Sequence, residues 1–261
     1  MPSLDRDLQS TQLDGRVALV TGVGQGIGRA FAHAFAAAGA VPIVADINAS
    51  QAERVAGEIA SQGAKVLAAQ VDVSEEESVG TMTQRVLDEF GRIDVLVNNA
   101  AIFSTLKMRP FLEIPIDEWD RVMRVNVNGP FLCSKAVAGT MKKNGFGRII
   151  NISSASIRMG RPNYLHYTTS KSALIGMTRS MARELGAFGI TVNAVLPGAT
   201  FTEVPRETVT AAQKDQIISA QCIPRPQTPD DLVGIVLFLA SDGSAFVTGQ
   251  SIVVDGGCTH S

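Results

Sequence analysis

The chain has 261 residues, a formal net charge of −2, and a composition that is 45% hydrophobic and 18% charged. These proportions are ordinary for a globular protein with a buried core, and they lack the basic excess that nucleic-acid-binding proteins carry. The start of the chain is polar with mixed charge, unlike a secretory signal, and the longest apolar runs are far too short to span a bilayer. We therefore expect neither a nucleic-acid nor a membrane partner.

The cysteines and histidines predict neither a disulfide framework nor a metal site. The three cysteines are odd in number and widely scattered, at Cys133, Cys222 and Cys258. This pattern favours a reducing compartment, so we expect a cytoplasmic protein. No Cys–His or His–His pair has the spacing of metal ligands. The three histidines are interpreted as bystanders: His33, His166 and His260.

Short segments rich in Val and Ile recur along the chain, and most are continuous apolar runs rather than alternations of apolar and polar residues. This pattern is typical of strands buried on both faces, as in a parallel sheet. The predicted strands are Arg16–Thr21, Val41–Asp46, Lys65–Val71, Ile93–Asn98, Arg148–Ser153, Ile190–Leu196 and Ser251–Val254.

The segments between these strands have helical periodicity, as Ala49–Gln62 and Glu75–Phe90 illustrate. Ser74 followed by Glu77 predicts a capping box, and Thr228-Pro229 predicts an N-cap with proline at the first helical position. Glycines stand where helical segments stop, as expected for the left-handed position after a helix. These glycines are Gly39, Gly63, Gly91, Gly145 and Gly189.

Strand–helix alternation from end to end predicts an α/β fold with right-handed crossovers. We expect one doubly wound, parallel, seven-stranded sheet with helices on both faces, because no shift in composition marks a second domain. In this interpretation residues 1–13 form a polar tail and residues 14–261 form the single domain. The Pro-, Thr- and Gln-rich segment Thr200–Pro229 breaks the rhythm and is predicted to be a mobile insertion.

The first predicted strand runs directly into the glycine-rich sequence TGVGQGIG, from Thr21 to Gly28, which leads into a helical segment. Such a turn lets the backbone approach a pyrophosphate, and the helix N-terminus supplies free N–H groups and the positive end of its dipole. A glycine motif alone is weak evidence, but here it lies between a strand and a helix, as dinucleotide binding requires.

An acidic residue, Asp46, ends the second predicted strand 18 residues beyond Gly28. A carboxylate at this point accepts hydrogen bonds from the adenosine ribose hydroxyls, and it would repel a 2′-phosphate. The neighbouring Gln25 and Ile47 are neutral, and Arg29, interpreted as the only nearby cation, is placed on the helix pointing away. The predicted cofactor is therefore NAD rather than NADP.

Polar residues and glycines gather at the carboxyl ends of the predicted strands, where ligands of open α/β sheets bind. After the third strand, Asp72-Val73 has two interpretations: it receives the adenine amino group, or Asp72 caps the next helix together with Ser74. The other members of the group follow strands four, five and six: Asn98-Asn99-Ala100, Ser153-Ser154 and Pro197-Gly198. This clustering predicts a binding site at one edge of the sheet.

The sequence YTTSK, from Tyr167 to Lys171, lies in a predicted long helix over Leu165–Ala187. Residues four apart share a helix face, so the phenol and the ammonium point the same way. A nearby positive charge lowers the pKa of a phenol from roughly 10 toward working pH, which suits general acid–base catalysis beside a hydride transfer. Tyr164 has Thr168 at the fourth position instead, so it is an internal control.

These motifs resemble the short-chain dehydrogenase/reductase family from about Leu13 to the end of the chain. The glycine turn, NNAA, NVNG, NISS, YTTSK and PGATFT occur in the family's order. The resemblance implies a Rossmann-like fold and a catalytic tetrad. In it, Tyr167 would be the acid/base, and Lys171 would hold the nicotinamide ribose and lower the pKa of the tyrosine.

The two other members of the implied tetrad are a serine and an asparagine. Ser154 would hydrogen-bond the substrate oxygen, and it is preferred over Ser153 because it lies 13 residues before Tyr167. Asn126 would hold a water in a proton relay behind the lysine.

The resemblance also implies contacts with NAD. Asn99 and Ala100 would line the adenosine side, and Thr200 and Thr202 would meet the carboxamide. The chain departs from the family pattern at Ala101, where glycine is usual, and at Thr200, where an aliphatic residue is common. The full set of expected cofactor contacts is Gly22, Gln25, Gly26, Ile27, Gly28, Asp46, Ile47, Asp72, Val73, Asn99, Ala100, Tyr167, Lys171, Pro197, Gly198, Thr200 and Thr202.

The expected substrate pocket lies between Ile102–Arg109, Ser156–Tyr164 and Thr200–Pro226. These segments are mainly apolar and carry few charges, so a small apolar secondary alcohol or its ketone is the favoured substrate. Arg158 and Arg161 could meet an acidic group, although arginines near loops are more often solvated.

Two other functions stay open. The framework also resembles a 3-oxoacyl-[acyl-carrier-protein] reductase, although Asp46 disfavours the NADPH that this reaction usually uses. A non-catalytic dinucleotide sensor on the same fold is the third interpretation, and an intact tetrad counts against it. Family members are commonly tetramers, so the resemblance implies a homotetramer with the C-terminal SIVVDGGCTHS at a subunit contact.

Overall fold

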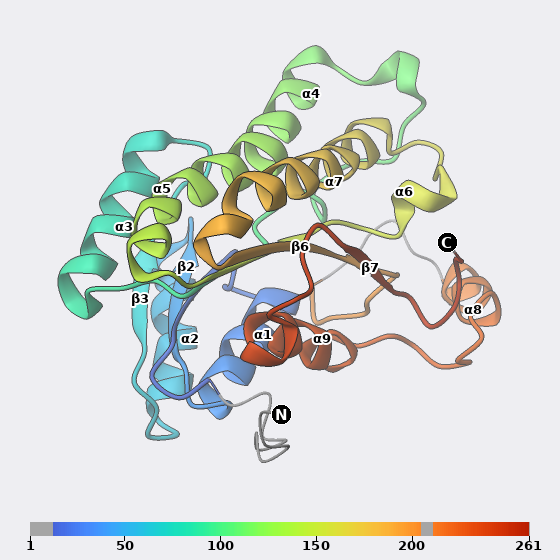
Figure 1. The fold of residues 1–261 in the computed structure, drawn as a ribbon. Helices are drawn as coiled ribbons and strands as arrows, with labels where there is room; N and C mark the ends of the chain where they lie inside the picture. The colour runs from blue at the N-terminus through green and yellow to red at the C-terminus, as the bar shows by residue number, and fades with distance from the viewer. Residues whose placement is uncertain (1–12, 205–210, 261) are drawn as a thin grey trace.

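A seven-stranded sheet forms the centre of the computed structural model, which describes residues 13–204 and 211–260 (Figure 1). Every strand pairing is parallel, in the order β3-β2-β1-β4-β5-β6-β7. The strands are β1 (Val17–Thr21), β2 (Val41–Asp46), β3 (Leu67–Gln70), β4 (Val95–Asn98), β5 (Gly147–Ile152), β6 (Ile190–Pro197) and β7 (Ser251–Val254). The predicted doubly wound parallel sheet is confirmed.

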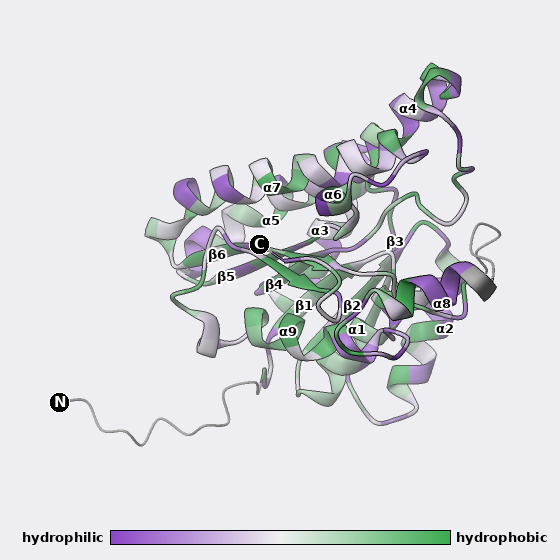
Figure 2. Ribbon diagram, turned by 90° about the vertical axis from the view of Figure 1, so that its right-hand side faces the viewer, coloured by the Kyte–Doolittle hydropathy of each residue, from purple (hydrophilic) through white to green (hydrophobic). Residues whose placement is uncertain are grey.

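Helices cover both faces of the sheet (Figures 1 and 2). One face carries α1 (Gly26–Ala37), α2 (Ala49–Ala60) and α9 (Asp230–Ala240). The other carries α3 (Glu76–Phe90), α5 (Gly129–Asn144) and α7 (Leu165–Leu185), with α4 (Ile116–Met123) leading into α5 through a π-helical turn at Arg124–Asn128. The short helices α6 (Ser156–Met159) and α8 (Ala211–Ser219) lie near the C-terminus of the chain (Figure 1).

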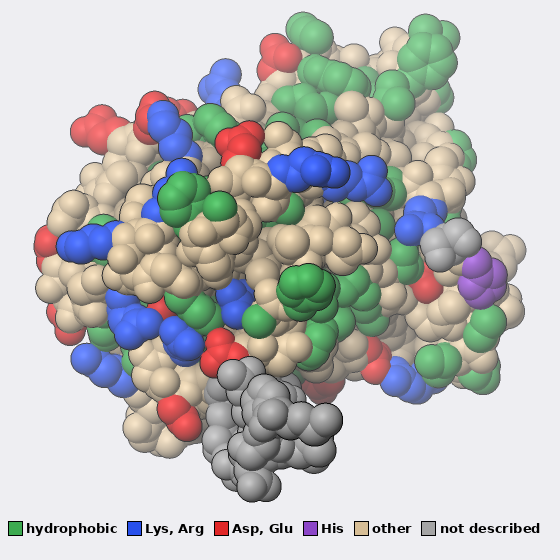
Figure 3. Space-filling model, in the orientation of Figure 1, with side chains coloured by type: hydrophobic (Ala, Val, Ile, Leu, Met, Phe, Trp, Pro, Cys, Tyr) green, Lys and Arg blue, Asp and Glu red, His purple; other side chains and the backbone are tan. Residues whose placement is uncertain are grey.

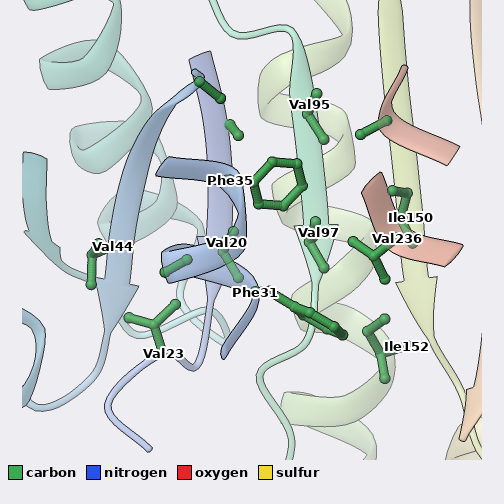
Figure 4. Packing of buried hydrophobic residues seen from close by; sticks show 14 of the residues in the cluster. Val20, Val23, Phe31, Phe35, Val44, Val95, Val97, Ile150, Ile152 and Val236 are labelled. Atoms are coloured by element: carbon green, nitrogen blue, oxygen red, sulfur yellow. The ribbon is translucent and has the colours of Figure 1, made fainter. Parts of the chain in front are cut away.

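Two apolar clusters, one on each face, hold the layers together. Figure 4 shows the first, in which Phe31 and Phe35 of α1 pack against Val20, Val97 and other strand residues. Both phenylalanines are almost fully buried, and each such burial contributes about 1.5–3 kcal/mol. The second cluster joins strand residues to α3, α5 and α7. Strands that supply side chains to both clusters must be apolar on both faces, which explains their continuous Val and Ile runs.

The direction in which successive strands are added to the sheet reverses between β1 and β4, because β2 and β3 lie on one side of β1 while β4 to β7 follow on the other. Loops after β1 and β4 therefore leave the sheet toward opposite faces, and a crevice opens between them at the carboxyl ends of the strands. This crevice is the edge at which the sequence gathers its polar residues and glycines.

Several predicted helix ends are confirmed and two are wrong. All five glycines predicted to follow helices have positive φ, between 64° and 85°. The capping box is not formed: α3 begins at Glu76 without a side-chain cap, and the Ser74 hydroxyl donates to Asp72 instead. Helix α9 begins one residue later than expected, with Pro229 at the cap position rather than inside the helix.

The predicted insertion Thr200–Pro229 is only partly irregular. It contains α8, and Thr200 forms a parallel bridge with Gln227 that ties the segment back on itself. Residues 205–210 of the insertion lie outside the described part of the chain.

The surface near the start of α4 carries large apolar side chains, which Figure 3 shows as a green area at the top of the molecule. Phe111, Leu112 and Ile116 are all exposed there. Within residues 13–204 and 211–260, no helix combines the length and the apolar character needed to cross a membrane.

Candidate active site

A cavity of about 1070 Å³ opens at the carboxyl edge of the sheet. All residues predicted to contact a cofactor line it, and so do three members of the predicted tetrad, Ser154, Tyr167 and Lys171. Asn126, the fourth member, lies behind the cavity wall and is fully buried. The cavity is large enough for a dinucleotide and a small second molecule, since ligand pockets commonly measure about 300–1,000 Å³.

Tyr167 and Lys171 lie one turn apart on α7, and both side chains face the cavity. The lysine Nζ is 5.9 Å from the centre of the tyrosine ring. Lys171 is only 3% exposed, and its ammonium donates to the Ile152 carbonyl oxygen at 2.7 Å. Burial lowers the pKa of Lys171 from 10.5 to about 8, because a charged amine loses its hydration there. The amine is therefore mostly cationic at neutral pH.

The two serines after β5 have different partners. Ser153 is buried, and its hydroxyl donates to the Lys171 carbonyl oxygen at 2.7 Å. Ser154 is half-buried, and its hydroxyl oxygen accepts from the Ser156 backbone N–H at 3.2 Å. Its own proton remains available for a molecule in the cavity, so this geometry supports the preference for Ser154 over Ser153.

Asn126 lies in the π-helical turn between α4 and α5, a feature that is rare and frequent at functional sites. Its side-chain oxygen accepts from the Ile102 N–H at 2.8 Å, and its amide donates to the Ile102 carbonyl at 3.2 Å and to the Ser170 hydroxyl at 3.1 Å. The side chain thus joins the loop after β4 to α7, one residue before Lys171. Its predicted part in a proton relay stays a prediction.

The glycine turn after β1 packs too closely for side chains. A Cβ on Gly22 would lie 2.7 Å from the Ala100 Cα, and one on Gly28 would lie 2.2 Å from the Gly22 carbonyl oxygen. The Asn99 side-chain amide donates to the carbonyl oxygens of Thr21 and Gly22, both at 2.9 Å. The loop after β4 therefore fixes the turn from behind, and the N-terminus of α1 faces the cavity.

Asp46 at the end of β2 lies beside this turn. Its carboxylate accepts from the Gly24 N–H at 2.8 Å and from the Asn48 N–H at 3.0 Å. Arg29 points away, as predicted, and donates to Glu58 of α2 at 2.8 Å. Glu58 also accepts from a second arginine, Arg54.

The prediction that Arg29 is the only cation near the turn is wrong. Arg54 of α2 donates to the Gly24 carbonyl oxygen at 2.6 Å, so its guanidinium lies beside the residue whose N–H binds Asp46. Its ion pair with Glu58 offsets the positive charge. A neutralised cation and a carboxylate therefore flank the position predicted for the adenosine ribose.

A second carboxylate lies at the N-terminus of α1. Glu203 accepts from the Gly26 N–H at 2.9 Å, although 177 residues separate the two in the sequence. This hydrogen bond is the main cause that lowers the pKa of Glu203, and Arg29 and Arg54 add to the shift. An anion thus already occupies one of the N–H groups that the sequence assigns to pyrophosphate binding.

Asp72 after β3 has the contacts of a local turn as well as a place in the cavity wall. One carboxylate oxygen accepts from the Ser74 N–H at 2.9 Å and from the Ser74 hydroxyl at 2.7 Å. The pair forms a turn ahead of α3, and the contact with an adenine stays a prediction.

The donor set fits a nicotinamide dinucleotide along its whole length. Backbone N–H groups at the start of α1 suit a pyrophosphate, Asp46 suits ribose hydroxyls, and the tyrosine–lysine pair lies at the far end of the same cavity. Gly22 and Gly28 of the glycine turn have no room for a side chain. Bare backbone at such a turn is what lets a phosphate group approach closely.

Aromatic rings line the end of the cavity that holds Tyr167. The ring centroids of Phe103 and Tyr167 are 4.6 Å apart, and those of Tyr164 and Tyr167 are 6.4 Å apart. His166 is turned away from this group, buried, with its Nε2 3.3 Å from a carboxylate oxygen of Glu118 in α4. The rings of Phe103 and Tyr164 form a wall beside Tyr167.

Comparison with protein families agrees with this geometry. The family model described as enoyl-(acyl carrier protein) reductase matches residues 22–259, which is nearly the whole chain. The chain belongs to the short-chain dehydrogenase/reductase family. As a member of this family, it is an oxidoreductase with a site for a nicotinamide dinucleotide.

Similar members of the short-chain dehydrogenase/reductase family differ in what they are named for. One is (2S)-[(R)-hydroxy(phenyl)methyl]succinyl-CoA dehydrogenase subunit BbsD of Thauera aromatica, 40% identical over 94% of this chain and 97% of that protein. Another is the 3-oxoacyl-[acyl-carrier-protein] reductase of a Synechocystis species, 42% identical over 95% and 98%. A gluconate 5-dehydrogenase of Burkholderia cenocepacia, solved with NADP and tartrate, superposes with a TM-score of 0.91 at 36% identity, covering 96% and 97% of the two chains.

Sequence reasoning about this short-chain dehydrogenase/reductase missed several residues of the cavity. Arg54 and Glu203 contact backbone atoms of the glycine turn, and no local pattern marks either of them. The cavity wall also includes residues of the π-turn region and of the C-terminal segment: Arg121, Arg124, Asp255 and Cys258. Only the tertiary fold brings these positions to the same edge.

Proposed function

We propose that the protein is an NAD-dependent oxidoreductase that interconverts a secondary alcohol and a ketone. The observation that carries the proposal is the position of Tyr167 and Lys171 on one face of α7, at the cavity wall with Ser154. When bound, the nicotinamide ring supplies the hydride acceptor or donor.

The protein groups handle the proton and the substrate oxygen. An alcohol that loses a hydride from carbon must also lose its hydroxyl proton, and Tyr167 as a phenolate takes that proton. The Lys171 ammonium favours the phenolate by its charge. Ser154 donates to the substrate oxygen and fixes its position. In the reverse direction the tyrosine hydroxyl returns the proton as the ketone receives hydride.

Two features support NAD over NADP. We expect the Asp46 carboxylate, beside the glycine turn, to accept from both ribose hydroxyls and to repel a 2′-phosphate. Arg54, the cation beside it, is paired with Glu58. The NADP bound to the gluconate 5-dehydrogenase of Burkholderia cenocepacia is the opposing observation.

Absorbance at 340 nm tests the proposal directly. Purified protein is incubated with a panel of secondary alcohols and NAD, and with the matching ketones and NADH, with NADP(H) in parallel. We expect NAD(H)-dependent turnover of at least one alcohol–ketone pair. No turnover together with tight NADH binding would favour a dinucleotide sensor.

A 3-oxoacyl-[acyl-carrier-protein] reductase is the second candidate, favoured by the 42% identity with the Synechocystis enzyme. A preference for NADPH and for β-ketoacyl thioesters in the same assay would establish it. The cytoplasmic location and the homotetramer stay predictions, and light scattering of the purified protein tests the latter.

A further inference from the structure

The substrate end of the cavity contains a guanidinium without a carboxylate partner. Arg161 lines the cavity and is half-buried. Among the described residues, no Asp or Glu oxygen lies within 4.0 Å of its nitrogens. The four other partly buried arginines of the described residues each have such a partner: Arg16 and Arg92 pair with Asp94, Arg29 with Glu58 and Arg109 with Glu118.

The ring of Tyr164 holds this guanidinium in place. The Arg161 Cζ lies 4.8 Å from the ring centroid, which is the distance of a cation–π contact. The ring is itself 2% exposed and packs against Phe103, 5.9 Å between centroids. A guanidinium supported on one face keeps N–H groups at its edge, where a carboxylate can bind in a bidentate manner.

Arg161 also lies within a limited distance of Tyr167. The guanidinium stacks on Tyr164, whose ring centroid lies 6.4 Å from that of Tyr167. These two distances place the Arg161 Cζ at most about 11 Å from the Tyr167 ring centre. The wall between them is apolar, formed by the rings of Phe103 and Tyr164. Of the two arginines that could meet an acidic group, Arg158 is exposed, whereas Arg161 is half-buried and lines the cavity.

We propose that the substrate carries a carboxylate and that Arg161 binds it. The inference rests on the proposed alcohol–ketone chemistry and narrows its substrate class to hydroxy acids and oxo acids. The carboxylate is separated from the reacting carbon by an apolar chain or ring that spans Tyr164.

Paired substrates test the assignment. Oxo acids of increasing chain length, and 4-oxocyclohexanecarboxylate, are each compared with their methyl esters in NADH-dependent reduction. We expect the wild-type protein to prefer the acids, and Arg161→Gln to lower the acid-to-ester ratio of kcat/KM by about ten- to a hundredfold, as for a lost hydrogen bond to a charged group. The NADH dissociation constant should stay unchanged.

Arg158→Gln is the matched control. Arg158 carries the same charge three residues earlier, but it is exposed, contacts the His260 carbonyl oxygen at 3.3 Å and does not line the cavity. Its replacement should leave the acid-to-ester ratio unchanged. Equal treatment of acids and esters by the wild-type protein, or an Arg161→Gln ratio equal to the wild-type ratio, would overturn the proposal while the hydride chemistry stands.

A binding measurement separates this proposal from the proposed function. Calorimetry on the protein–NADH complex compares cyclohexanecarboxylate with cyclohexanecarboxamide, which needs no turnover. Preferential binding of the carboxylate that disappears in Arg161→Gln would support the subsite even if no ketone is reduced. Equal binding of the two compounds would refute it.

Discussion

The Lys171 ammonium donates a 2.7 Å hydrogen bond to the carbonyl oxygen of Ile152, the last residue of β5. The sheet therefore holds the charge that the helix presents to the cavity. Because the amine is anchored by backbone, its position relative to Tyr167 does not depend on a flexible side-chain partner. This arrangement determines what replacement of either residue should do.

Replacement of Tyr167 by phenylalanine should remove turnover and spare NADH binding. The phenol hydroxyl is the only group lost, and general acid–base catalysis is worth about a hundred- to ten-thousandfold in rate. Steady-state rates and NADH fluorescence titration measure the two effects. Tyr164→Phe is the control, because Tyr164 lines the same cavity without a lysine four residues later. A Tyr167→Phe protein with more than a few per cent of the wild-type rate would refute the acid/base role.

The stability of the protein should depend on pH through Lys171. The folded-state pKa of about 8 lies below the unfolded value of 10.5. Between these values the unfolded state keeps the proton that the folded state has lost, so this group makes the free energy of unfolding rise with pH. Below pH 8 both states are protonated, and the buried charge costs about 3 kcal/mol.

The Lys171→Met variant isolates this effect, because all other titrating groups are common to both proteins. Urea unfolding from pH 7 to pH 10.5 should show the wild-type protein gaining up to about 3 kcal/mol relative to the variant. Parallel pH profiles for the two proteins would mean that Lys171 does not titrate in this window.

Removal of the Asp46 carboxylate should relax the cofactor preference. In Asp46→Ala the ribose hydroxyls lose an acceptor and a 2′-phosphate loses a repulsive neighbour, while Arg54 remains beside Gly24. We expect the NAD-to-NADP ratio of kcat/KM to fall by about ten- to a hundredfold. In the double variant Asp46→Ala/Arg54→Gln, the NAD-to-NADP ratio of kcat/KM should lie between those of the wild-type protein and Asp46→Ala. An unchanged ratio in the single variant would show that Asp46 does not contact the ribose.

Removal of the Glu203 side chain should tighten NADH binding. Its carboxylate accepts from the Gly26 N–H, and a pyrophosphate seeks the same end of α1, so the two anions compete. Glu203→Ala should lower the NADH dissociation constant by about two- to fivefold, the usual effect of one charge at a helix terminus. Glu53→Ala, which removes an exposed carboxylate from α2, is the control for net charge. Weaker NADH binding by Glu203→Ala would instead mean that the contact between Glu203 and the Gly26 N–H helps to hold the cofactor.

The sheet and most of the cavity could be predicted because both follow from local patterns and parallel topology. Val41–Asp46 and Ser251–Val254 have the predicted bounds, whereas β3 is shorter than Lys65–Val71. As an edge strand it is only partly buried, so its apolar pattern is weak. The order of the strands was not predicted.

Contacts between distant parts of the chain were beyond sequence reasoning. Arg54 and Glu203 bind backbone atoms 30 and 177 residues away. Every residue offers such backbone groups, so no residue type in the sequence marks the partner. The capping box is absent for a related reason, since the N–H and the hydroxyl of Ser74 both donate to Asp72. Short polar side chains have several local partners, and the motif alone cannot rank them.

The buried amide of Asn126 has a consequence for chimeric enzymes. It forms hydrogen bonds with the N–H and the carbonyl oxygen of Ile102 and with the Ser170 hydroxyl. These bonds couple the loop after β4 to α7. We therefore expect a donor loop grafted after Phe103 to keep these hydrogen bonds and the ring that packs against Tyr167, while it changes the rest of the substrate wall. A graft that begins before Ile102 would break the hydrogen bonds between Asn126 and the Ile102 backbone, and we expect it to lower the rate with every substrate.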